Sequence, residues 1–186
     1  MSFRSLLELD ARLSDQLRVA EKPGLLRTFS AFLAHSGDSW LWGAVLVILW
    51  FLGNSAWKQW AVTEFVGIAG LAALVMTIKF VVRRKRPEGE WGGIYRNTDP
   101  HSFPSGHAAR ALLIAIIASA FVPAWLVILL WVWAPLVLLA RVAMGVHYVS
   151  DVIAGAALGM IVALLGLQVR QPLLAWLVNL IGSALW

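Results

Sequence analysis

The sequence predicts an all-α integral-membrane protein: a bundle of five transmembrane helices, or six if the C-terminal segment also spans, preceded by an amphipathic interfacial helix. Of its 186 residues, 60% are hydrophobic and 13% are charged, against about 45–50% and about 25% in soluble domains. A soluble domain of this size could not bury that much apolar surface. Eleven tryptophans also suit a membrane protein, because indole rings favour the headgroup level.

The first 36 residues are expected to form an N-terminal interfacial segment. Residues 3–21 place apolar side chains mostly three or four positions apart, with charges between them. This spacing predicts an amphipathic helix in the membrane interface, ended by Pro23-Gly24. Residues 25–36 are a shorter apolar stretch that fits either the interface or the first span. No cleavable signal peptide is expected, because acidic residues interrupt the segment.

A transmembrane core is expected over residues 37–170. Five apolar stretches there approach or reach the roughly 20 residues needed to cross about 30 Å of hydrocarbon. They are residues 38–53, 60–82, 104–122, 123–141 and 150–169. Pro123 marks the connection between the third and the fourth. Residues 171–186 suit an interfacial or short membrane segment better than a sixth span.

Two polar interruptions, residues 83–103 and 141–151, follow the second and the fourth span. With five spans, both interruptions fall on the same side of the bilayer. Almost all the unusual polar residues therefore converge on one membrane face, which is where we expect a functional site.

The net charge of +5 is concentrated in two places, the first 27 residues and the block Arg83–Arg86. Anchoring to anionic headgroups explains much of this charge, Arg84 and Lys85 in particular. Nucleic-acid binding is not expected, because the rest of the chain is apolar. The absence of cysteine excludes disulfides and thiolate chemistry.

Lys79 lies near the end of an otherwise apolar span, where an ionisable side chain is costly and suggests function. At 3.6 residues per turn, Arg83 and Arg86 share its helical face. Pro87 disfavours helix at Arg86 and is expected to end the element there. The alternative is snorkelling of these cations at the membrane edge.

The third span opens with Pro104-Ser105-Gly106-His107. Proline suits a first helical turn, and the free backbone N–H groups there form an anion site with the helix dipole. Gly106 allows a ligand to approach the backbone, and the Ser105 hydroxyl adds a donor. A structural histidine at a helix start is the alternative for His107.

The third group is Arg141, His147 and Asp151. Arg141 and His147 would not share a helical face, so we expect a turn at Gly145. Ser150 is a suitable N-cap for the fifth span, with Asp151 in its first turn. The Asp151 carboxylate can then fix the His147 tautomer and leave the other ring nitrogen as a nucleophile. The alternative is a simple cap beside an interfacial histidine.

Together the three groups supply cations, a backbone anion site and two histidines. Phosphoryl transfer needs these parts: charge stabilisation of the phosphoryl oxygens, a nucleophile and a general acid. No cluster of carboxylates suited to a hard divalent cation is evident. We therefore expect chemistry without a metal or cofactor.

These residues resemble the signature of the type 2 phosphatidic acid phosphatase superfamily, which also includes the vanadium haloperoxidases. The family motifs K-x6-R-P, P-S-G-H and S-R-x5-H-x3-D match residues 79–87, 104–107 and 140–151. Ala140 replaces the family serine, and we expect adaptation to this change and not loss of activity. The resemblance covers roughly residues 60–169.

The resemblance implies that His147 attacks phosphorus and forms a phosphohistidine while Asp151 holds its ring. His107 would protonate the leaving oxygen and then help to activate water. The implied phosphate ligands are Lys79, Arg86, Arg141, Ser105 and the Gly106 backbone. By position we add contacts to a second phosphate or a lipid headgroup, from Arg83, Arg110 and His101.

The expected function is hydrolysis of a lipid phosphate: a polyprenyl diphosphate, phosphatidylglycerophosphate or phosphatidic acid. The expected partners are this substrate and membrane lipids, with no prediction of oligomeric state. A vanadate-dependent haloperoxidase and a non-catalytic phospholipid-binding module are the alternatives. We expect a bacterial or archaeal plasma membrane. The N-terminus and the site share a face, which positive-inside counting would make cytoplasmic, but we favour the extracytoplasmic side.

Overall fold

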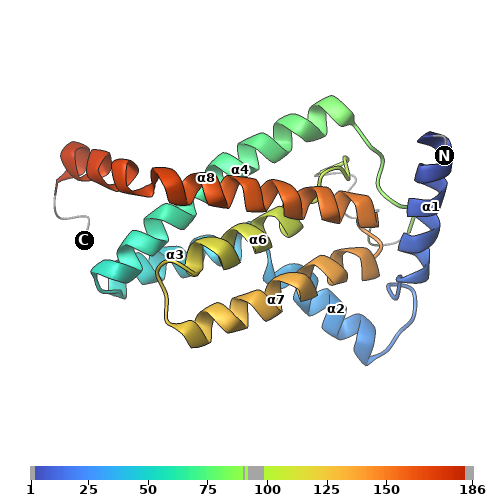
Figure 1. The fold of residues 1–186 in the computed structure, drawn as a ribbon. Coiled ribbons are helices and arrows are strands. Elements are labelled where there is room, and N and C mark those ends of the chain that lie inside the picture. The colour runs from blue at the N-terminus through green and yellow to red at the C-terminus, as the bar shows by residue number, and fades with distance from the viewer. Residues whose placement is uncertain (1–2, 90, 92–98, 183–186) are drawn as a thin grey trace.

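The computed structural model describes residues 3–89, 91 and 99–182, and every named element within them is a helix (Figure 1). The helices are α1 (Phe3–Gln16), α2 (Leu25–Ser36), α3 (Ser39–Leu52), α4 (Ser55–Val82), α6 (Gly106–Ala118), α7 (Ala124–Ala143) and α8 (Val149–Ile181). The predicted all-α class is confirmed, and each of the five expected apolar stretches contains a helix.

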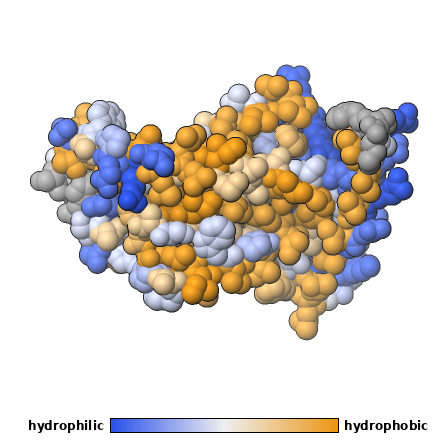
Figure 2. All heavy atoms as spheres, in the orientation of Figure 1, coloured by the Kyte–Doolittle hydropathy of each residue, from blue (hydrophilic) through white to orange (hydrophobic). Residues whose placement is uncertain are grey.

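Within the part of the chain that the structure describes, three helices, α4, α7 and α8, are long and apolar enough to cross a membrane. The pair α2 and α3 also passes when taken together, with a bend of 55° between its halves. The ambiguous residues 25–36 are therefore the first half of a broken helix pair. Figure 2 shows a broad apolar belt between hydrophilic ends of the molecule, as a membrane protein requires.

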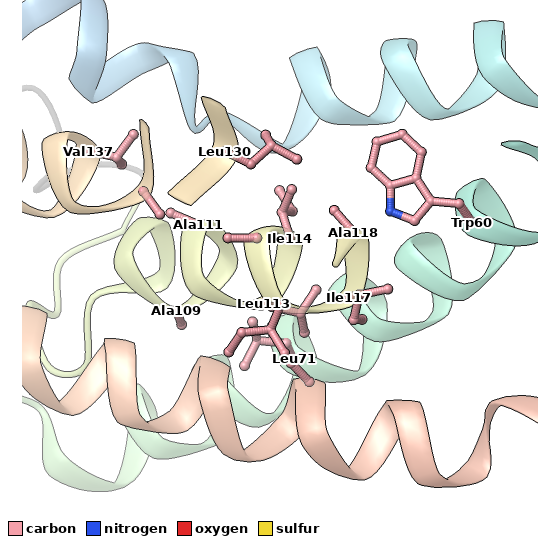
Figure 3. Packing of buried hydrophobic residues seen from close by; sticks show 14 of the residues in the cluster. Trp60, Leu71, Ala109, Ala111, Leu113, Ile114, Ile117, Ala118, Leu130 and Val137 are labelled. Atoms are coloured by element: carbon pink, nitrogen blue, oxygen red, sulfur yellow. The ribbon is translucent and has the colours of Figure 1, made fainter. Parts of the chain in front are cut away.

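Helix α6 is 13 residues long, shorter than the predicted stretch 104–122, because the Ser105 side chain caps its start and a turn follows Ala118. It nevertheless forms the centre of the core: most of its side chains are fully buried against α4, α7 and α8 (Figure 3). A short helix surrounded by protein does not have to match the thickness of the bilayer.

The contact between α6 and α8 depends on two glycines one turn apart. A Cβ atom at Gly155 would overlap the Ser105 carbonyl, and one at Gly159 would overlap the Ala109 carbonyl. Small residues at this spacing let two helix backbones approach closely in a membrane. The close packing fixes the start of α6 beside the start of α8.

The amphipathic N-terminal helix is confirmed as α1, and it ends at Gln16. Its leucines are exposed, whereas Ser14 is buried. Ser14 Oγ accepts a hydrogen bond from Val149 N at 3.0 Å, and Asp10 Oδ1 accepts one from Ser150 N at 2.9 Å. The polar side of α1 thus caps the first turn of α8.

Two further helix ends differ from the prediction. Helix α4 ends at Val82 because Arg83 adopts a left-handed conformation with φ of 53°. Arg83 and Arg86 therefore do not share a helical face with Lys79. Helix α8 begins at Val149 and continues past Pro172 to Ile181, so residues 171–181 are part of the same helix.

Candidate active site

His147 lies in the connection between α7 and α8, with its side chain 1% exposed. The chain turns at Gly145, whose φ of 64° matches the predicted need for glycine. Nε2 of His147 lies 3.2 Å from Arg86 Nη1. Nδ1 lies 3.6 Å from Asp151 Oδ2 and makes no hydrogen bond within the described part of the chain.

Asp151 is fully buried in the first turn of α8. Its Oδ2 accepts a hydrogen bond from Tyr148 N at 2.9 Å, and its Oδ1 accepts one from Arg84 Nη1 at 2.8 Å. Tyr148, not the predicted Ser150, is the N-cap of the helix. Asp151 is adjacent to the His147 ring, as predicted, but at 3.6 Å the pair is longer than a hydrogen bond.

Arg84 is part of this network, which corrects its assignment as a membrane anchor. Besides Asp151, it donates to Ser150 Oγ at 2.6 Å and to Asp10 Oδ2 at 2.7 Å. Its guanidinium carbon lies 4.0 Å from the centre of the Tyr148 ring. Arg84 therefore ties the α1 helix to the carboxylate beside the candidate nucleophile.

Lys79 and Arg86 are buried and converge on one carboxylate, Asp99, which the sequence reasoning missed. Lys79 Nζ forms an ion pair with Asp99 Oδ2, and Arg86 Nη2 donates to the same oxygen at 2.8 Å. Arg86 also donates to the Val146 carbonyl at 2.8 Å. The non-helical path after Val82 is what brings Arg86 back to His147.

Arg141 is 1% exposed at the end of α7 and donates to the Ala34 carbonyl of α2 at 3.3 Å. The preceding Ala140 packs in a small apolar cluster with Leu33 and Ala34 of α2. The methyl group that replaces the family hydroxyl therefore lies in apolar surroundings.

His107 lies in the first turn of α6 and contacts a second carboxylate that the sequence reasoning missed. His107 Nε2 lies 2.7 Å from Asp38 Oδ1, in the break between α2 and α3. Arg110, one turn further along α6, donates to the Gly37 carbonyl. The only feature of the sequence that could have indicated Asp38 is its position as an acidic residue between two apolar stretches.

Three other predicted contacts are placed differently. The Ser105 hydroxyl is buried and accepts from Ala108 N at 3.4 Å, as a helix cap. Arg83 is exposed and donates to the Phe80 carbonyl, and His101 packs edge-on against the Phe80 ring. Neither Arg83 nor His101 lines the cavity described next.

A cavity of about 190 Å³ connects the two histidines. Its polar end is lined by Lys79, Asp99, His107, Arg110, Arg141 and His147, with the Gly106 backbone beside them. One long wall is apolar and comes from α4: Ile68, Leu71, Ala72, Val75 and Met76. The cavity thus joins a cationic end, suited to an anion, to an apolar surface, suited to a hydrocarbon chain.

Burial lowers the pKa of the His147 ring well below its ordinary value of 6.5, and neighbouring cations lower it further. These cations are Arg141, Arg86 and Lys79. A positive environment penalises the protonated ring. His147 is therefore neutral at pH 7, the form in which an imidazole nitrogen is nucleophilic. No group of three or more carboxylate or histidine side chains within the described residues could hold a metal ion.

Comparison with known proteins gives a consistent set of relatives. Residues 60–174 match the family model of the PAP2 superfamily. The chain is 31% identical over 157 residues to decaprenylphosphoryl-5-phosphoribose phosphatase of Mycobacterium tuberculosis, covering 82% of this chain and 84% of the relative. It is 29% identical over 150 residues to undecaprenyl-diphosphatase of Sulfolobus acidocaldarius, covering 78% and 71%.

Solved structures give the same picture of the fold. The crystal structure of a transmembrane PAP2-type phosphatidylglycerolphosphate phosphatase from Bacillus subtilis aligns with a TM-score of 0.73 at 24% identity. The alignment covers 90% of this chain and 87% of that one. The structure of LpxE from Aquifex aeolicus aligns with a TM-score of 0.66 at 26% identity, covering 87% and 94%.

Proposed function

The chain belongs to the PAP2 superfamily and is an integral-membrane lipid phosphatase, and from that premise we propose that it works through a phosphohistidine on His147. The observation that carries the proposal is the shared cavity: His147 and His107 line it together with Lys79 and Arg141. A nucleophile, a proton donor and buried cations around one anion-sized space are the parts that phosphoryl transfer requires.

In the proposed reaction, His147 Nε2 attacks phosphorus as the bond to the leaving oxygen breaks. His107 gives its proton to that oxygen, so the lipid leaves as a neutral alcohol or, from a diphosphate, as a monophosphate. A water molecule then attacks the phosphohistidine, transferring its proton to His107. Inorganic phosphate and neutral His147 are released, and both histidines return to their starting states.

The cations are proposed to bind different oxygens of the phosphoryl group. Lys79, Gly106 and Arg141 line the cavity, whereas Arg86 is outside the lining and has its Nη1 3.2 Å from Nε2 of His147. Asp99 occupies part of this cationic site, and we expect the substrate phosphate to compete with its carboxylate for Lys79. We assign the Ser105 hydroxyl to holding the helix start, because it caps Ala108 N.

The substrate class is proposed to be a lipid phosphate with a long apolar tail, and polyprenyl phosphates or diphosphates are the first choice. The apolar α4 wall adjoins the cationic end of the cavity, and two of the similar proteins carry polyprenyl substrates in their names. Phosphatidylglycerophosphate and phosphatidic acid are also proposed as candidate substrates, because the polar residues of the site bind phosphate and do not distinguish one tail from another.

The test is phosphate release by purified protein in detergent, over polyprenyl and glycerolipid phosphates, with a chelator present. We expect turnover, inhibition by vanadate, and an acid-labile phosphoryl-enzyme in rapidly quenched samples. The variant His147→Ala should lose at least about 10³-fold in kcat and the phosphoryl-enzyme with it. The matched control is His101→Ala, outside the cavity, which should keep wild-type turnover. Full activity of His147→Ala would contradict the mechanism.

The active site is proposed to face the extracytoplasmic side. Lys79, Arg86 and Arg141 are buried in the site and so do not count as headgroup-facing charges in the positive-inside rule. Because the chain has no cysteine, single replacements can report orientation. In intact cells, an impermeant maleimide should label Glu88→Cys beside the site and spare Ser55→Cys at the far end of α4. Labelling of Ser55→Cys alone would reverse the assignment.

A further inference from the structure

Asp38 holds the candidate general acid from outside the phosphate cavity. Its Oδ1 lies 2.7 Å from His107 Nε2, and both side chains are largely buried, at 19% and 17% exposed. Among the described residues, Nε2 is the ring nitrogen of His107 that forms a hydrogen bond. Nδ1 is therefore the nitrogen left for a leaving oxygen in the cavity.

Asp38 is itself fixed by contacts to its second oxygen. His35 Nδ1 lies 3.2 Å from Oδ2, and Trp40 Nε1 donates to the same oxygen at 3.3 Å. His35 precedes the break between α2 and α3, and Trp40 follows it. A carboxylate held in this way presents one oxygen to His107 in a fixed orientation, which is how a supporting contact pre-organises a catalytic group.

The charges that face His107 explain why a carboxylate is needed there. Arg110 and Arg141 line the same cavity as His107, and their positive charges disfavour a protonated ring, whereas the Asp38 carboxylate at 2.7 Å favours it. A general acid has to carry its proton when the lipid oxygen leaves. Without an anionic partner, the protonated form of His107 would be still less favourable in this cationic site.

The two histidines differ in this respect. The carboxylate beside His147 is 3.6 Å from the ring and hydrogen-bonds to Arg84 and the Tyr148 N–H instead. The carboxylate beside His107 is at hydrogen-bond distance. His107 therefore has an anionic hydrogen-bond partner that His147 lacks, and this partner favours the protonated form of the general acid.

We propose that Asp38 is a positioning residue for the reaction: it fixes the His107 ring with Nδ1 toward the cavity and stabilises its protonated form. The proposal rests on the proposed function, because it assigns to Asp38 a role through the general acid of that mechanism. It adds a fourth segment, the break between α2 and α3, to the three motifs of the site.

The test compares two phosphate monoesters that differ in leaving group. A lipid alkyl phosphate needs a proton on its leaving oxygen, whereas p-nitrophenyl phosphate expels a stable phenolate. Asp38→Asn should lower kcat/KM for the alkyl phosphate by about 10²-fold, the lower end of general-acid contributions, and for the aryl phosphate by less than about fivefold. The basic limb of the alkyl-phosphate pH profile should also move to lower pH.

Two further variants show whether the effect passes through His107. In a His107→Ala background, Asp38→Asn should cause no additional loss, because residues that act as a unit are not additive. Asp15→Asn, an exposed aspartate outside the phosphate cavity, is the matched control and should behave as wild type. Vanadate inhibition of Asp38→Asn within about threefold of wild type would show that the phosphate site is still folded.

The outcomes separate this inference from the proposed function. Equal losses on both substrates, additivity with His107→Ala, or no loss at all would each overturn the role of Asp38. Failure of the proposed function has another signature: the wild-type protein would release no phosphate from either ester, or His147→Ala would retain full activity.

Discussion

At the scale of single residues, the surroundings of His147 set its pKa, and the pKa can be measured through the pH dependence of activity. Its ring is buried against Arg141 and Arg86, and both burial and these cations lower its pKa. The neutral, nucleophilic form therefore persists at pH values at which a solvent-exposed histidine would already be protonated. The same cations later stabilise the phosphoryl group that the ring accepts.

The lowered pKa of His147 predicts how kcat/KM changes at acid pH. Because the pKa of His147 lies well below 6.5, kcat/KM, corrected for ionisation of the substrate, should stay level as pH falls through 6.5 and decline only at lower pH. Replacing Arg86 by Gln removes one cation and should move the decline toward higher pH, whatever its effect on the maximal rate. A wild-type midpoint at or above 6.5 would contradict this account.

The sequence predicts those site residues that lie within its three motifs. Spacing relates His147 to Asp151 and Lys79 to Arg86, and the structure brings both pairs close to one cavity. It does not predict Asp38, Asp99 or Arg84. Asp38 and His107 are 69 positions apart, and Arg84 and Asp151 are 67 apart. Contacts over such separations arise from helix packing, which periodicity does not encode.

At the scale of elements, apolar stretches predict where helices occur, and local contacts decide where they end. The α4 helix stops at Val82 because Arg83 turns left-handed, although Pro87 is the obvious stop signal in the sequence. The α8 helix starts at Val149 because Ser14 and Asp10 of α1 accept hydrogen bonds from the N–H groups of its first turn. The site depends on these ends, since Arg86 and His147 both lie just outside a helix.

The α6–α8 contact predicts opposite effects for one substitution at two glycines of α8. Gly159→Ala places a methyl group against the Ala109 carbonyl and should destabilise the protein by about 1–3 kcal/mol, as overpacking does. Gly166→Ala meets only Ile117 Cδ1 at 3.9 Å and should stabilise by about 0.5–1 kcal/mol, because alanine favours helix. Thermal unfolding midpoints in the same detergent measure both. A Gly159→Ala midpoint at or above wild type would refute the close contact.

At the scale of the whole molecule, the position of the cavity relative to the apolar belt suits a lipid substrate. The belt in Figure 2 ends at hydrophilic surfaces, and the cationic end of the cavity lies near one of these ends, where α4 and α7 terminate and α8 begins. From there the apolar wall runs back along α4 toward the belt. A lipid in the bilayer can therefore place its phosphate at His147 while its tail stays in apolar surroundings.

This arrangement predicts that the α4 wall contributes to binding of the tail and contributes little to the chemistry at phosphorus. Ala72 and its neighbour Ala73 are both exposed, but Ala72 lines the cavity and Ala73 does not. Ala72→Phe should lower the ratio of kcat/KM for a polyprenyl phosphate to that for p-nitrophenyl phosphate by about tenfold, the equivalent of roughly two methylene groups displaced from apolar contact. Ala73→Phe adds the same ring to the lipid-facing side and should leave the ratio unchanged. If both substitutions lower the ratio equally, the tail does not follow this wall, because a general effect on the membrane helix would then explain the loss.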